Sequence, residues 1–448
     1  MKKIALFLSL TLLWLAPLTP SPATAQDRYV EIVEKYARPK VFIEANVFPA
    51  AATANPRVVM HLRISYDYLF FAKESDTKFK SDVTFSAEFL SNQNSIARRS
   101  ANAIAIADSF GATKDRTRFL SATLDVDLPA GEYDVITELT DAETSKLLRI
   151  DRRKLTVKPV GGEAVAISTP VMIQRPEIQT GAVVMSPLTL SGNAFFGKDF
   201  TVAVELLASG NLDSARYELY QKKADKEDVL LARSPVAPQN LYAVDPFTLT
   251  RDASGKLFIT APRNAASRRR LALIDLDGRK ISNAKYLLKV FASSGGKMSE
   301  VSKEFEVSWV DMPYALYDID LSTRIMEYIA PPQVISDVQT GSQPEREQKF
   351  KNFWKQKDPT PDTEFNEVMA EYYRRVDYAF FNFYTTREYG WRTDRGKIYI
   401  LYGEPTKIDR EFPANAPTRE TWTYTSLGKT FVFSDRTKTG TYELVQQK

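Results

Sequence analysis

A single histidine is the side chain of this 448-residue sequence best suited to catalysis. The chain has no cysteine, so a nucleophilic triad or a zinc site would have to be built around His61 alone. Residues 58–66 alternate between apolar and polar side chains, as in a strand, and this pattern puts His61 on the polar face beside Arg63. We therefore expect His61 to lie at the surface, with no catalytic or metal-binding role.

Two carboxylates near the C-terminal end could form an acid–base pair. Asp394 and Glu404 flank an apolar segment, residues 397–402, which we predict to be a strand about 20 Å long. Glycoside hydrolysis needs two carboxylates roughly 5 to 10 Å apart, so these two are poorly placed for it. We expect Asp394 instead to accept backbone N–H groups within its own turn.

Other patterns that carry chemistry are absent from the sequence. It has no glycine-rich phosphate loop, no Gly-x-Ser-x-Gly motif and no cluster of metal ligands. The acidic residues of its predicted loops lack the spacing of a calcium-binding loop; they are Asp225, Glu227, Asp228, Asp275 and Asp277. We predict no catalytic residue, no bound cofactor and no metal.

The charges are balanced and interspersed, with 60 Lys and Arg against 56 Asp and Glu. Such a balance gives no broad positive field, and we expect no binding to nucleic acid. The densest basic run, residues 263–270, lies between predicted strands. We interpret it as a solvated loop, with an anion site as the alternative.

The first 25 residues have the pattern of a secretory signal peptide. Lys2 and Lys3 precede an apolar stretch over residues 4–15, and Ala23 and Ala25 supply the small residues of a cleavage site. The alternative is an uncleaved anchor, but the apolar stretch is about half of the ~20 residues that span a bilayer. We predict cleavage after Ala25, no transmembrane segment afterwards, and a periplasmic or secreted protein, with outer-membrane association as a further option.

Two strand-rich regions follow, over residues 27–158 and 164–310. Each contains six or seven short segments of alternating or apolar residues separated by turn signals. This spacing predicts two all-β immunoglobulin-like sandwich domains, joined by a linker at residues 158–162. One larger β unit is the alternative.

From about residue 311 the apolar period changes from 2 to about 3.6. We predict short helical segments before residue 331, a helix over about 344–357, and a longer helix capped by Thr360. The strand at 397–402 then begins an antiparallel meander, whose later strands are expected at 421–425, 430–434 and 441–445. Residues 311–448 are thus predicted to form an α+β domain with its helices first.

The segment Gly390-Trp391-Arg392-Thr393-Asp394-Arg395-Gly396, followed by Lys397 to Pro405, resembles the signature of the GWxTD-domain family. The resemblance extends over residues 311–448 and implies an exported protein of Gram-negative bacteria, without implying a particular reaction. Glu404 departs from the residue that the family more often has there. The motif positions are expected to have a structural or an interaction role; they are Gly390, Trp391, Thr393, Asp394, Arg395, Gly396, Tyr402, Gly403, Pro405 and Trp422.

The roles of the large and charged motif residues stay open at this point. Trp391 could fold onto the helices or form a ligand platform. Arg392 and Arg395 could bind an anion or a partner carboxylate, or pair with Asp394 or Asp409.

We expect a non-catalytic binding module that recognises an envelope protein through its GWxTD and sandwich domains. The alternatives are a secreted, glycan-directed hydrolase that uses carboxylates of the C-terminal domain, and a sugar- or peptide-binding module.

Overall fold

The computed structural model describes most of the chain after residue 24. Strands account for 46% and helices for 20% of it, so the protein is mostly β. The predicted signal peptide lies outside the described residues except for Ala25, and so does the predicted linker except for Lys158. The described ranges are 25–36, 39–50, 54–116, 118–158, 163–224, 226–251, 257–385 and 388–448.

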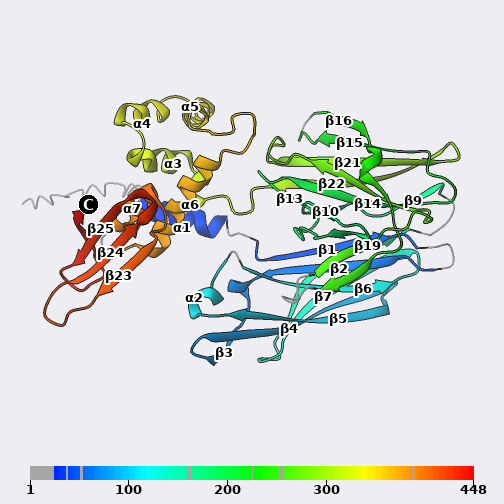
Figure 1. Ribbon diagram of the computed structural model, residues 1–448, viewed down its shortest axis with the longest axis horizontal. Helices are drawn as coiled ribbons and strands as arrows, with labels where there is room; N and C mark the ends of the chain where they lie inside the picture. The colour runs from blue at the N-terminus through cyan, green and yellow to red at the C-terminus, as the bar shows by residue number, and fades with distance from the viewer. Residues whose placement is uncertain are drawn as a thin grey trace, which may run out of the picture. The chain divides into compact units, whose positions relative to one another are not determined.

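The chain forms two compact units, and one of them joins the start of the chain to its C-terminal third (Figure 1). This unit has a core rich in aromatic side chains, among them Trp354, Tyr373 and Trp391, each at most 2% exposed. Its helices and 3-10 turns are α1 (Ala25–Lys35), η3 (Tyr314–Tyr317), α3 (Ile319–Ile325), η4 (Met326–Tyr328), α4 (Pro332–Val338), α5 (Gln343–Lys355), α6 (Glu367–Asn382), α7 (Asp394–Tyr402) and η5 (Thr425–Leu427).

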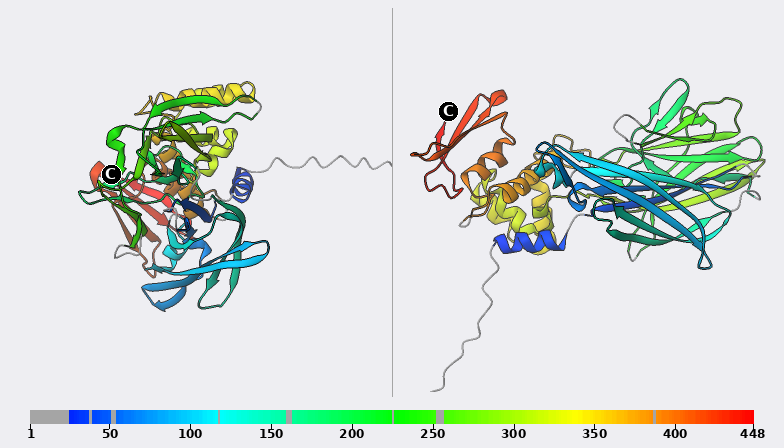
Figure 2. Two further views of the ribbon diagram at one scale, coloured as in Figure 1. Left: turned by 90° about the vertical axis from the view of Figure 1, so that its right-hand side faces the viewer. Right: turned by 90° about the horizontal axis from the view of Figure 1, so that it is seen from below.

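An antiparallel sheet completes this unit, in the order β23-β24-β25-β26, and is seen from two further sides in Figure 2. Trp422, Phe431 and Phe433 share one face of the sheet and are buried in the aromatic core. The strands are β23 (Lys407–Glu411), β24 (Thr418–Tyr424), β25 (Lys429–Asp435) and β26 (Glu443–Gln447).

Two expectations about this region are wrong. Residues 397–402 are the body of helix α7 and not a strand, and the first strand of the meander is β23. Thr360 does not cap a helix, because α6 begins only at Glu367. The preceding residues form a turn in which the side chain of Phe365 packs against Trp309 with ring centroids 5.3 Å apart.

The second unit is built of β-strands and covers residues 38–312 and 357–368. Its first half contains β1 (Val41–Phe48), β2 (Arg57–Ser65), η1 (Tyr66–Tyr68), β3 (Ala72–Ser75), β4 (Lys78–Ser91), β5 (Asn94–Ala107), α2 (Phe110–Thr113), β6 (Phe119–Asp127), β7 (Gly131–Asp141) and β8 (Leu147–Val157). The sheet β1-β2-β6 packs against the sheet of β3, β4, β5, β7 and β8 over a shared apolar core.

The other half of this unit contains three more sheets. They are β10-β14-β20-β17 with β9 added, β11-β12-β19-β18, and β13-β22-β21-β15-β16. The strands are β9 (Val165–Ile167), β10 (Val171–Ile173), β11 (Glu177–Ile178), β12 (Ala182–Met185), β13 (Ala194–Phe195), β14 (Phe200–Ala208), β15 (Ser214–Gln221), β16 (Val229–Pro235), β17 (Leu241–Ala243), β18 (Thr248–Arg251), β19 (Leu257–Pro262), β20 (Arg269–Leu276), β21 (Ala284–Ser294) and β22 (Lys297–Ser308), with the 3-10 turn η2 (Pro238–Asn240).

Both faces of β2 are buried in this arrangement. Met60 and Leu62 belong to the core shared with β4 and β7, whereas Val59 belongs to a core shared with β10, β14 and β20. The sheet β1-β2-β6 is therefore an inner layer, and polar residues on its second face must find partners inside the protein.

Candidate functional site

The Gly390–Gly403 segment is a turn followed by helix α7. Thr393 is the N-cap of α7, and its Oγ1 accepts the N–H of Gly396 at 3.1 Å. Asp394 lies in the first turn, where a negative charge stabilises a helix. The cap and this charge favour a helix here, even though the following Ile, Tyr and Leu residues are compatible with a strand.

Two glycines of the motif are required by close backbone contacts. A Cβ on Gly390 would lie 2.0 Å from the carbonyl oxygen of Ala379 in α6, and a Cβ on Gly396 would lie 1.9 Å from the carbonyl oxygen of Gly390. Neither neighbour can move away easily, because both are backbone atoms. The glycines thus allow α6, the turn and α7 to touch directly.

Trp391 is a core residue, with none of its surface exposed. Its ring lies beside Tyr389 at a centroid distance of 6.2 Å, and the guanidinium of Arg392 lies 4.9 Å from the indole. The hydroxyl of Tyr328 donates to the carbonyl oxygen of Trp391 at 2.9 Å, and burial raises the pKa of that hydroxyl. The indole therefore anchors the turn and is not a platform for a ligand.

Asp394 is tied to the far end of the domain. Its Oδ2 accepts the backbone N–H of Leu444 in β26 at 2.6 Å. The expectation of a bond within its own turn is wrong, because Thr393 already occupies the capping role there. No local pattern around Asp394 signals a partner 50 residues away.

Arg395 belongs to a buried charge cluster with Glu420, which is 3% exposed. Its guanidinium lies 3.7 Å from the Glu420 carboxylate and 4.2 Å from the ring of Tyr442. Glu420 also accepts the indole N–H of Trp422 at 2.5 Å and the Nε–H of Arg410 at 3.2 Å. The carboxylate is thus surrounded by donors that hold β23, β24 and α7 together.

The C-terminal end of α7 is closed by its own set of contacts. Gly403 has a φ of +80°, and its carbonyl oxygen accepts the hydroxyl of Tyr424 at 2.9 Å. Arg375 of α6 donates to the carbonyl oxygens of Ile400 and Leu401 at 3.3 and 3.4 Å. The ring of Tyr402 packs 5.1 Å from that of Phe431, and Pro405 is half-buried after the turn.

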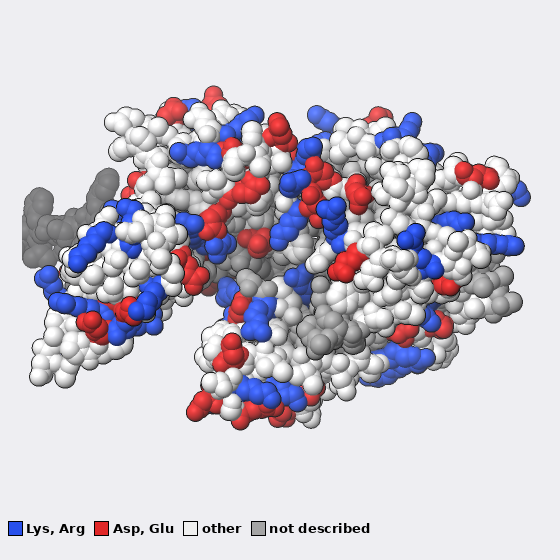
Figure 3. Space-filling view, viewed as in Figure 1, with Lys and Arg blue, Asp and Glu red and all other residues white. Residues whose placement is uncertain are grey.

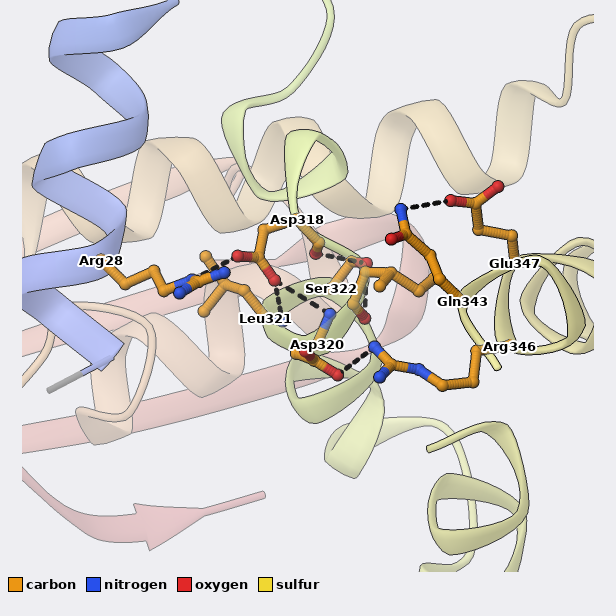
Figure 4. A network of polar contacts seen from close by, with 9 residues as sticks. Arg28, Asp318, Asp320, Leu321, Ser322, Gln343, Arg346 and Glu347 are labelled. Carbon is orange, nitrogen blue, oxygen red and sulfur yellow. Dashed lines mark hydrogen bonds and ion pairs between the residues drawn. The ribbon is translucent and has the colours of Figure 1, made fainter. Parts of the chain in front are cut away.

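A second polar network was not anticipated from the sequence and is drawn in Figure 4. Asp318 caps α3, accepting the N–H groups of Asp320 and Leu321 at 2.9 and 3.0 Å, and it also accepts Arg28 of α1. Asp320 in turn accepts Arg346 of α5. An aspartate directly before an apolar helical segment is a capping signal, but the partner Arg28 lies 290 residues away.

His61 is buried rather than exposed, with 2% of its surface accessible. It lies on the second face of β2, in an inner sheet, and this layer is why the surface expectation is wrong. Its Nδ1 lies 2.9 Å from Thr123 Oγ1, and it is paired in register with Glu44. Burial lowers its pKa to about 4, although the charge of Glu44 opposes this shift.

Among the described residues, no three side chains of the metal-binding types come together. On the face shown in Figure 3, the basic and acidic side chains that are described lie interspersed. No described helix has both the length and the apolar character that crossing a membrane requires.

The comparisons with known proteins identify the C-terminal part. The family model of the GWxTD domain matches residues 297–448, about a third of the chain. This part of the chain is therefore a GWxTD domain, which confirms the resemblance seen in the sequence. No curated protein matches the chain.

Several solved structures are similar to parts of the chain. A D1–D4 fragment of the ICAM-5 ectodomain is 12% identical, over 59% of this chain and 53% of that one, with a TM-score of 0.14. The purple acid phosphatase PPD1 from yellow lupin (Lupinus luteus) seeds is 12% identical over 59% and 40%, with a TM-score of 0.16. The titin fragment A168169 is 9% identical over 60% and 100%, with a TM-score of 0.13. This chain thus aligns with about half of the ICAM-5 fragment and two fifths of the phosphatase, and such scores carry no argument about function.

Proposed function

We propose that this chain is an exported envelope protein that binds another protein without catalysis, through its GWxTD domain and its β-rich unit. Two carboxylates of the domain, those of Asp394 and Glu420, support this proposal, because both have structural partners. Asp394 accepts a backbone N–H group, and Glu420 is held by Arg395, Arg410 and Trp422.

The rival function, a glycan-directed hydrolase, needs two facing carboxylates with space for a sugar. Asp394 and Glu404 lie at opposite ends of α7, about 15 Å apart along the helix axis. Asp394 is also engaged by Leu444. These placements favour the binding protein over the hydrolase.

The observation that carries the proposal is an apolar edge strand. β16 pairs with β15 at the end of its sheet and exposes three consecutive aliphatic side chains, Val229, Leu230 and Leu231, by 44, 43 and 48%. The backbone groups along an edge strand are available to a further strand, and exposed aliphatic side chains give such a partner an apolar surface. Proteins usually protect an edge with charges or proline, and in β16 only the end near Arg233 and Pro235 has them.

The proposal also covers the fold class of the β domains and the cellular location of the protein. The β-strands of residues 27–158 and 164–310 are proposed to form immunoglobulin-like sandwiches, supported by sheets that pack over apolar cores in each region. Residues 1–25 are proposed to be a signal peptide cleaved after Ala25, which gives a periplasmic or secreted protein. N-terminal sequencing of the exported chain tests this, and a first residue other than Gln26 would contradict it.

The binding function is tested by capture of proteins from an envelope extract of the source cells at several salt concentrations. The wild-type chain is expected to retain a defined protein, and Leu231→Lys is expected to reduce that capture at least tenfold. Leu427→Lys is the matched control, because Leu427 is 51% exposed but lies in η5, which belongs to the other compact unit. Capture of nothing by the wild-type chain would overturn the proposal, and equal capture by the two variants would rule out the edge.

A further inference from the structure

Helix α1 lies in a groove of the GWxTD domain, the α1 seat, whose lining includes Phe380, Asp377 and Asp318. Tyr29 is fully buried and stacks on Phe380 of α6, with ring centroids 3.9 Å apart and an interplanar angle of 19°. Ile32, one turn later, is 7% exposed and belongs to the same core. The Tyr29 hydroxyl donates to the buried carboxylate of Asp377. The seat therefore accepts an aromatic ring with a hydroxyl, followed by an aliphatic side chain.

An ion pair lies at the edge of the seat. Arg28 donates to Asp318, whose carboxylate also caps α3 (Figure 4). At the other end of α1, Tyr36 stacks on Tyr317 at 4.1 Å. Along α1, the basic Arg28 thus contacts an acidic residue and the aromatic Tyr29 stacks on a ring. The aliphatic Ile32 packs into the apolar core.

The helical structure of α1 depends on its packing against the domain. An isolated helix of 11 residues is marginal in water, so α1 depends on the seat for its structure. Its contacts with Asp318 and Asp377 join residues 290 and 348 positions apart. With residues 1–25 cleaved, as proposed above, α1 is the first element of the chain, and terminal elements open at a lower free-energy cost than central ones.

We propose that this seat is a docking site for an amphipathic helix of a partner protein, and that α1 is the chain's own competitor for it. The partner helix carries a basic residue, a tyrosine beside it and an aliphatic residue three positions after the tyrosine, because these are the groups that the seat receives from α1. Its docking follows the helix-in-groove mode of recognition. This site is separate from the β16 edge.

Competition with α1 lowers the apparent affinity measured for a partner helix. A site that is free only part of the time binds with an apparent Kd raised by the inverse of its free fraction. Weakening α1 therefore strengthens binding of a helix in trans. If α1 and the added helix did not use the same groove, weakening α1 would bring no such gain.

The test uses the mature full-length chain, residues 26–448, and a fluorescent peptide that copies residues 26–36 as the probe. Fluorescence anisotropy is expected to show at least tenfold tighter binding to the Tyr29→Ala chain than to the wild-type chain. Val30→Ala is the matched control, because Val30 is 41% exposed on α1. The peptide carrying Tyr29→Ala is expected to lose at least tenfold in affinity for every chain.

A milder variant covers the case in which the Tyr29→Ala chain does not fold. The side chain of Arg28 is 55% exposed in the wild-type chain. The Arg28→Ala chain is therefore expected to fold, and it lacks the contact with Asp318. This chain is expected to bind the peptide at least threefold more tightly than the Val30→Ala chain. Equal affinity for a folded variant and its control, or unchanged binding of the altered peptide, would overturn the inference. The probe needs no envelope partner, so this result is independent of the capture experiment.

Discussion

The α-carbon of Gly390 faces the carbonyl oxygen of Ala379 so closely that an added Cβ would lie 2.0 Å from it. This contact joins the first residue of the motif to the helix α6 that precedes it. It gives the first glycine of the GWxTD signature a packing role that needs no ligand or reaction.

Gly390→Ala is expected to destabilise the GWxTD domain by about 3 kcal/mol or more, since the displaced atom is backbone and overpacking of this kind usually costs 1–3 kcal/mol. Chemical denaturation followed by tryptophan fluorescence measures the change. Gly181→Ala is the control, because a Cβ there meets no atom within 4 Å. Equal stability of the two variants would contradict the close approach.

Thr393→Ala removes the N-cap of α7 and is expected to cost about 1 kcal/mol of unfolding free energy. Thr393→Ser keeps the oxygen that accepts the N–H of Gly396 and is expected to cost less than half as much. Denaturant unfolding of the two variants makes the comparison. A larger loss in the serine variant would show that Thr393 acts through its methyl group instead.

Stability is expected to depend on pH through His61. Burial lowers the pKa of His61 in the folded protein to about 4, below its ordinary value of 6.5, so the unfolded chain binds the proton more readily. The free energy of unfolding therefore has its full value above pH 6.5 and decreases as the pH falls towards 4. The loss amounts to about 3 kcal/mol across that window, at 1.36 kcal/mol for each pKa unit.

This pH dependence is measured by denaturant unfolding of the β-rich unit at several pH values between 4 and 7. His61→Gln removes the titrating group and is expected to flatten that part of the profile. A wild-type profile already flat between pH 6.5 and 4 would show that His61 is hydrated in the folded protein.

The sequence predicted helices followed by an antiparallel meander in the GWxTD domain, but it assigned residues 397–402, the body of α7, to the first strand. Residues 398–402 are apolar and β-prone, so α7 looked like a strand, while β23 lacks an apolar pattern because all of its residues are exposed. The features that decide the matter are the Thr393 cap and the backbone contact of Gly396. The cap was visible in the sequence, whereas the glycine contact is tertiary.

Helix α1 was not predicted from the sequence, for a different reason. Tyr29, Ile32, Val33 and Tyr36 have helical spacing, a signal that was present among residues assigned to a β region. The seat that stabilises this helix is made by residues beyond position 310, and no local pattern reveals it. Likewise, the burial of His61 depends on a second sheet covering β2, which the alternation of a single strand does not predict.

The central claim is that Asp394 is a structural residue whose carboxylate is held by the backbone of β26. Hydrogen exchange of the Leu444 amide, compared between the wild-type chain and Asp394→Asn, tests this claim most directly. The account predicts a strongly protected amide in the wild-type chain and exchange at least tenfold faster in the variant. An unprotected wild-type amide, with exchange unchanged by Asp394→Asn, would leave the carboxylate available for chemistry and contradict the account.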